Sequence, residues 1–99
     1  MMREEVYLSI LYDYYGELLT SKQKEYFEKY YFLNLSLSEI AEILNVSRNA
    51  VHKQLKVIEK HLLNFEEKLH LYEKDKYLEE ILEDLENKDL KTKLEKLLK

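Results

Sequence analysis

Apolar residues recur at steps of three and four along most of the chain, which is the period of an amphipathic α-helix. The spacing predicts a first helix from Glu4 to Tyr15, which Gly16 ends. A second helix is predicted to begin after Thr20, because Gln23 follows at the spacing of a capping box. This helix should stop near Asn34. The pattern therefore predicts an all-α protein.

A helix, a tight turn and another helix are predicted in the middle of the chain. Ser36 and Glu39 have the spacing of a capping box and should start the first of these helices. Asn45 stands where that helix must stop, and asparagine adopts the left-handed conformation more readily than most residues. Val46 is expected to be the apolar plug of the turn, and Ser47 to cap the next helix. This order of elements is a helix-turn-helix motif.

The helix after the turn is predicted to be much longer than a helix needs to be to contact bases in the major groove of a nucleic acid. Its apolar positions alternate at steps of four and three from Val51 to Tyr72, which is a heptad seam. Two further amphipathic helices are expected, over residues 77–85 and 90–98. The far half of the seam must be covered by these helices or by a second copy of the chain, and we expect a symmetric dimer. The residues of this dimer or packing seam are Leu62, Phe65, Leu69 and Tyr72.

Length and composition fit one helical domain over residues 1–99, with a helix-turn-helix core over 1–61 and an extension over 62–99 for dimerisation. Proline is absent and there is one glycine, as expected of helices. The polar, acidic start is unlike a signal peptide, and no apolar run approaches the ~18 residues of a membrane span. With no cysteine, there is no disulfide framework. We expect a cytoplasmic protein without membrane insertion.

Charge is distributed unevenly along the chain, whose net charge is −4. Between Ser47 and His61 there are four basic residues against one acidic residue, and most of them fall opposite the buried side of the helix. A helix enters a major groove in this way, with N-terminal residues at base edges and later lysines at phosphates. The alternative is that these charges are only solvated. The expected nucleic-acid-binding residues are Ser47, Arg48, Asn49, His52, Lys53, Lys56 and Lys60.

The segment from Glu66 to Glu86 is acidic, with nine carboxylates against three lysines. Phosphate should avoid this half of the chain. Such a run is usually a solvated helix face, and the alternative is a docking surface for a basic protein partner.

Residue types for catalysis are lacking, so we expect no enzyme, no metal site and no cofactor. The three histidines are nine residues apart, which is ~13 Å along a helix, too far to share a metal ion. One glycine cannot build a phosphate-binding loop. Aromatic residues can stack on bases, but six of the nine tyrosines fall on faces predicted to be buried. These are Tyr7, Tyr14, Tyr15, Tyr26, Tyr30 and Tyr31.

Four stretches of the chain resemble the YlxM family of small bacterial helix-turn-helix proteins, which are similar to region 4 of sigma factors. The stretches are residues 11–23, 35–42, 46–51 and 66–74. The resemblance implies an all-α, sigma-region-4-like fold with an extended recognition helix and short C-terminal helices, in a dimeric protein. Genes of that family usually neighbour those of the signal recognition particle, which implies a regulatory part in protein targeting. Two local departures from the wider sigma-like pattern are Asn45 in place of the usual turn glycine and His52-Lys53-Gln54, which give the recognition helix less positive charge than sigma-type helices often have.

Three functions follow from these features. In the first, a regulatory protein binds nucleic acid, DNA or RNA, through the predicted interface. In the second, the same helix binds the RNA of the signal recognition particle or its GTPase subunit, and the acidic C-terminal half contacts a basic protein surface; as a non-enzymatic adaptor for the GTPase, the protein would use the helix-turn-helix only as a scaffold. In the third, the helix-turn-helix is only the scaffold of a dimeric interaction module. If binding weakens steeply as the salt concentration rises, the protein contacts phosphates, which would favour the first two functions over the third.

Overall fold

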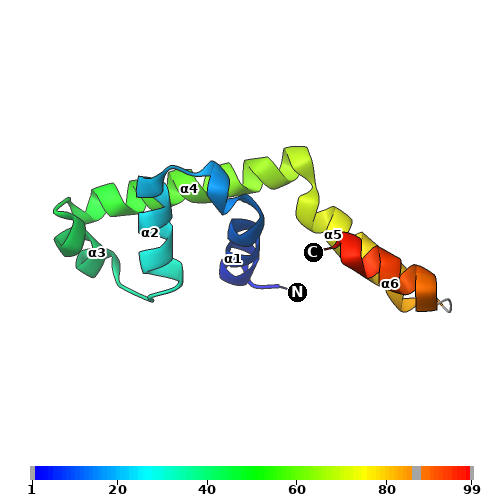
Figure 1. The fold of residues 1–99 in the computed structure, drawn as a ribbon. Coiled ribbons are helices and arrows are strands. Elements are labelled where there is room, and N and C mark those ends of the chain that lie inside the picture. Colours follow the sequence, from blue (N-terminus) through cyan, green and yellow to red (C-terminus); the bar gives the residue numbers. More distant parts are fainter. Residues whose placement is uncertain (1, 86–87, 99) are drawn as a thin grey trace.

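The computed structural model describes residues 2–85 and 88–98 (Figure 1). In these ranges it contains six α-helices, one 3-10 turn and no strand, which confirms the all-α prediction. No helix among the described residues is long and apolar enough to cross a membrane. The elements are α1 (Glu4–Tyr15), η1 (Gly16–Leu18), α2 (Ser21–Tyr31), α3 (Leu37–Leu44), α4 (Arg48–Leu69), α5 (Leu71–Glu83) and α6 (Lys88–Leu97).

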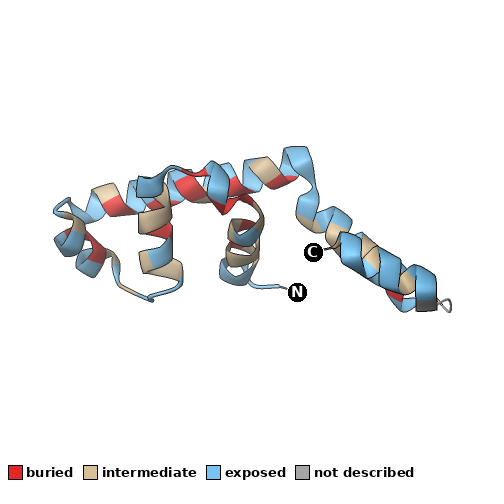
Figure 2. Ribbon diagram, viewed as in Figure 1, coloured by how far each residue is buried: buried red, intermediate tan, exposed pale blue. Residues whose placement is uncertain are grey.

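The 22-residue helix α4 is the support on which the first three helices pack (Figure 1). Helices α1, α2 and α3 all contact it, and the buried strip of α4 faces them (Figure 2). The seam residues of α4 are therefore covered by the chain itself as far as Leu62. The core consists of Leu8, Leu11, Tyr15, Leu19, Tyr26, Phe27, Ile40, Ala41, Val51, Leu55, Ile58 and Leu62.

Side-chain caps fix the ends of the helices where the sequence predicts them. Both hydrogen bonds of each capping box are present, between Thr20 and Gln23 and between Ser36 and Glu39. Asn45 has a φ of 56° and a ψ of 49°, so α3 ends on the expected left-handed residue. These local hydrogen bonds confirm the helix-turn-helix.

Two apolar residues, Val6 at the three- and four-residue spacing of the first predicted helix and Val46 in the turn, are predicted to be covered and are exposed instead. Val6 is exposed, and the covered side of α1 consists of Leu8, Leu11 and Tyr15. Because α1 crosses α4 rather than lying along it, only a narrow strip of α1 is covered. Val46 is also exposed and does not plug the turn, although its backbone N–H closes the end of α3 by donating to the Ala41 carbonyl.

Helix α4 ends at Leu69, short of the expected Tyr72, because His70 adopts the left-handed conformation with a φ of 56°. The carboxylate of Glu66 caps the next helix: it accepts hydrogen bonds of 3.1 Å from the backbone N–H groups of Tyr72 and Glu73. Glu66 is only 7% exposed. Its placement in a solvated acidic face was thus wrong, and it fixes the junction of α4 and α5.

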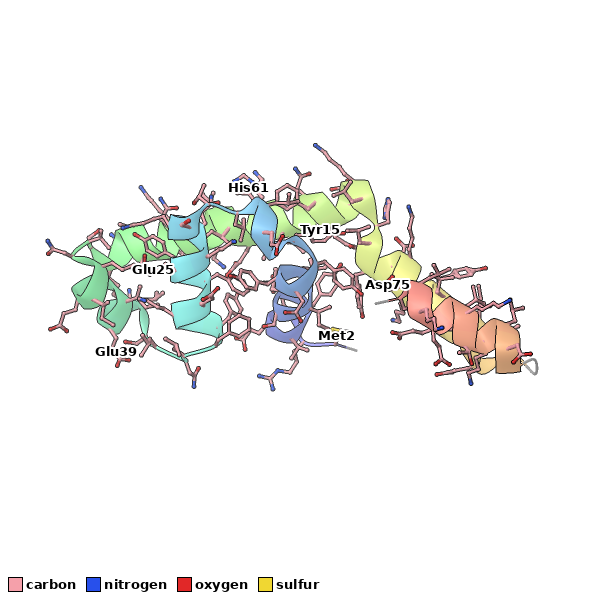
Figure 3. The ribbon with its side chains drawn as sticks, in the orientation of Figure 1. Met2, Tyr15, Glu25, Glu39, His61 and Asp75 are labelled. Atoms are coloured by element: carbon pink, nitrogen blue, oxygen red, sulfur yellow. The ribbon has the colours of Figure 1, made fainter. Side chains whose placement is uncertain are left out.

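Tyr15 connects this junction to α1 (Figure 3). Its hydroxyl donates to Glu66 Oε1 at 2.5 Å and accepts from the N–H of Leu71 at 3.0 Å. Burial and the hydrogen bond to Glu66 raise the pKa of Tyr15 to about 12. The phenol is therefore protonated at neutral pH and acts as the donor. We call the contacts among Tyr15, Glu66 and the first turn of α5 the junction.

Beyond the junction, α5 and α6 form an antiparallel pair that projects from the rest of the molecule (Figure 1). We call this pair the arm. Tyr14 donates a 2.6 Å hydrogen bond to Asp75, and Tyr72 meets the edges of Tyr7 and Tyr14. The radius of gyration is 17.2 Å, against ~13 Å for a compact domain of about this length. The arm accounts for the elongated shape.

Replacing Glu66 by alanine should destabilise the protein by roughly 2–3 kcal/mol, because three donors lose their acceptor in a buried place. Tyr15→Phe should cost about 1 kcal/mol, since it removes the hydroxyl and keeps the ring. The two substitutions act on one network, so the double variant should lose less than the sum. Urea unfolding of the four proteins measures this, and strict additivity would contradict the junction described here.

Asn45→Ala should destabilise the protein by about 1 kcal/mol, because alanine lacks the short polar side chain that makes the left-handed conformation more accessible to asparagine than to other non-glycine residues. Asn45→Gly should be neutral or slightly stabilising at the same position. Thermal unfolding of both variants tests the turn geometry, and equal losses for glycine and alanine would disagree with it.

Candidate nucleic-acid interface

The first three turns of α4 carry the predicted interface. The hydroxyl of Ser47 accepts a 3.0 Å hydrogen bond from the N–H of Ala50 and so starts the helix. The six other predicted residues are all exposed, and they follow one another along α4 from its first residue, Arg48, to Lys60. By helical period, Arg48 and His52 lie on a flank, while Asn49, Lys53, Lys56 and Lys60 lie opposite the buried Val51.

Part of the positive charge is already paired. Lys56 Nζ lies 3.4 Å from Glu59 Oε1, and the other carboxylate oxygen of Glu59 accepts a 2.7 Å hydrogen bond from Tyr31. Burial and this hydrogen bond raise the pKa of Tyr31, so its hydroxyl stays a donor. Within the described ranges, Arg48, Lys53 and Lys60 form no ion pair, so they carry the unpaired charge of the interface.

Helix α3 contributes no basic residue to the interface. Glu39 and Glu42 are exposed on it, and hydrogen bonds from Ser36 lower the pKa of Glu39. The Glu39 carboxylate is therefore charged at neutral pH and disfavours a phosphate close to the start of α3. Within the helix-turn-helix, the basic side chains therefore all lie on α4.

The four residues of the predicted dimer or packing seam have different surroundings. Leu62 is fully buried by its own chain, and Phe65 is half-buried with its ring 5.9 Å from that of Tyr15. Tyr72 lies on α5 and is half-buried against α1, which leaves Leu69 as the exposed member. His61 stacks on Phe65 from the side of α4 that faces away from α1 and α2 (Figure 3). The seam is thus mostly packing within the chain.

Sequence reasoning missed one group of possible metal ligands, because it compared the histidines only with each other. Ligand atoms of Glu66, His70 and Glu73 lie within 4.8 Å of one another, and the signal was their spacing across the end of α4. The Glu66 carboxylate already accepts three hydrogen bonds, and His70 Nδ1 lies 2.9 Å from Glu73. The junction accounts for this proximity.

The chain is similar to bacterial proteins of known family. A UPF0122 protein of Clostridium acetobutylicum is 47% identical over 87 residues, which is 88% of this chain and 75% of that protein. A UPF0122 protein of Oceanobacillus iheyensis is 45% identical over 85 residues, which is 86% of this chain and 81% of that protein. Another from Desulforamulus reducens is 52% identical over 73 residues, which is 74% of this chain and 62% of that protein.

The family model agrees with these relatives and with the resemblance seen in the sequence. It matches residues 2–99, which include the helix-turn-helix and the arm. The family is described as one of helix-turn-helix proteins. The chain therefore belongs to the UPF0122 family of YlxM / p13-like helix-turn-helix proteins.

Proposed function

We propose that this protein is a nucleic-acid-binding regulator that recognises its target with residues 48–60 of α4. The observation that carries the proposal is a capped helix-turn-helix whose second helix presents Arg48, Lys53 and Lys60 with no ion pair to any described residue. In helix-turn-helix proteins the corresponding helix lies in the major groove, with its first residues at the bases. The remaining predicted residues lie on the same part of α4.

Position along the helix assigns a role to each side chain. Arg48 and Asn49 are nearest the N-terminus, where arginine can contact guanine or phosphate and asparagine can pair bidentately with adenine. His52 and Lys53 follow one turn later. Lys60 lies about three turns along the helix, which suits a phosphate contact.

Duplex DNA is the first target that we propose. The major groove of B-form DNA admits an α-helix, whereas the major groove of A-form RNA is too narrow for side chains to read. The RNA of the signal recognition particle would have to be read at a loop or bulge. Few phosphate contacts are available, since Lys56 is paired and the whole chain is acidic, so binding should be modest.

The resemblance to YlxM proteins supplies a cellular setting for this activity, and we place the regulator in the cytoplasm and in the signal recognition particle pathway. We also propose that it acts as a homodimer, since paired helix-turn-helix units read two half-sites. The second candidate function is an adaptor that binds the targeting GTPase. Exposed apolar residues on the arm favour it, because such surfaces mark protein contacts.

Replacing Lys53 and Lys60 together by alanine should flatten the salt dependence of binding. Loss of two phosphate contacts lowers the slope of log K against log salt by about 1.8 on duplex DNA. Lys56→Ala should have a smaller effect, because Glu59 already pairs with that lysine. Fluorescence anisotropy with a labelled duplex across a salt series measures these slopes.

A matched control is the pair Lys74→Ala and Lys76→Ala, which removes two exposed lysines from the arm and should leave the slope unchanged. Repeating the salt series with the RNA of the signal recognition particle, and with its GTPase present, shows which of these the protein binds. Equal slopes for wild type and for the α4 variant would refute the proposed interface. Binding only in the presence of the GTPase would favour the adaptor.

A further inference from the structure

Exposed apolar residues occur on both helices of the arm. On α5, Tyr77 is 62% exposed and Ile81 37%, and on α6, Leu90 is 45% exposed and Leu97 75%. A groove of about 600 Å³ follows this stripe of α5, lined by Tyr77, Ile81 and their neighbours. Single exposed apolar residues are ordinary, but several on one face indicate a contact surface.

Helical geometry places the two stripes on the same face of the arm. Leu82, 5% exposed, marks the side of α5 turned toward α6, and Ile81 precedes it by 100° of rotation. On α6 the half-buried Lys91 and Leu94 mark the side turned toward α5; Leu90 precedes Lys91 by the same 100°, and Leu97 lies two turns further along the same side as Leu90. Because α5 and α6 run antiparallel (Figure 1), residues that lie 100° before the contact side of each helix point toward the same face of the pair. The arm therefore has one apolar face built by both helices.

The two helices of the arm have net charges of opposite sign. By sequence, α5 has five carboxylates and two lysines, a charge of −3, whereas α6 has four lysines and two carboxylates, a charge of +2. Glu80 on α5 and Lys93 on α6 flank the apolar stripes, each on the edge away from the other helix. A surface that is half acidic and half basic is complementary to a copy of itself.

We propose that the arm's apolar face docks on the same face of a second copy, with α5 of one chain against α6 of the other. Opposite charges face each other only if the two-fold axis runs parallel to the helices, because an axis across them would lay α5 on α5. The four helices then form a bundle. The parts of the two chains that contain α1 to α4, which we call the bodies, extend from the same end of this bundle. This proposal rests on the proposed homodimer and moves its interface from the α4 seam to the arm.

The size of the face sets the expected strength of the dimer. A 13-residue helix is ~20 Å long and two helices side by side are ~20 Å wide, which gives a footprint of about 400 Å² on each copy. This is at the low end for specific interfaces, and small interfaces of this kind dissociate readily. A dimer in equilibrium with monomer at micromolar concentrations is therefore expected.

Sedimentation equilibrium of the full chain without nucleic acid tests the interface directly. Wild type should dimerise with concentration, and Tyr77→Glu with Leu97→Glu should weaken the dimer by at least tenfold. The control is Leu18→Glu, which places the same charge on an equally exposed leucine of η1 (59% exposed) and should not change the association. Circular dichroism confirms that the variants remain helical.

A charge exchange tests the pairing of α5 with α6. Glu80→Lys and Lys93→Glu should each weaken the dimer, and the double variant should recover it. Absence of dimer in wild type up to several hundred micromolar, or an equal effect of Leu18→Glu, would overturn the proposal. Failure of the double variant to recover would overturn the pairing. Salt-dependent DNA binding by a variant that stays monomeric would show that the interface on α4 stands independently of the arm.

Discussion

The buried carboxylate of Glu66 is the constraint on which the shape of the molecule depends. Removing a carboxylate from water is costly unless hydrogen-bond donors surround it, and here there are three. One donor is the Tyr15 hydroxyl from α1, and the others are backbone N–H groups that begin α5. A single side chain of α4 thereby connects three helices and sets the direction in which the arm leaves the body.

The predictions that agree with the structure depend on residues close together in the sequence. Capping boxes and the left-handed Asn45 involve neighbours within four residues, so their signals are complete in the sequence itself. The junction could not be found in the same way, because Tyr15 and Glu66 are 51 residues apart. The heptad pattern in the sequence continues across His70, where the helix breaks in the left-handed conformation. It does so because Tyr72, on the next helix, still occupies an apolar position of the pattern. Patterns of spacing do not report where a long helix breaks.

In the candidate interface, too, some features follow from nearby residues in the sequence and others depend on distant ones. Exposure of the predicted residues on α4 follows from helical period alone, once Val51 and Leu55 are placed in the core. Pairing of Lys56 does not follow, because Glu59 is held in place by Tyr31 from α2, 28 residues earlier. Counting charges along the sequence therefore overstates the positive charge that α4 has free for a phosphate.

The left-handed residue at the end of α4 also gives the arm a mechanical property. Body and arm meet at His70 and at the contacts beside it, so a small rotation there acts as a lever. A rotation of ~10° would displace the far end of a ~20 Å helix by ~3.5 Å. The hydrogen bonds around Glu66 oppose this rotation, because a change in the direction of α5 would stretch the bonds that its first turn donates to that carboxylate.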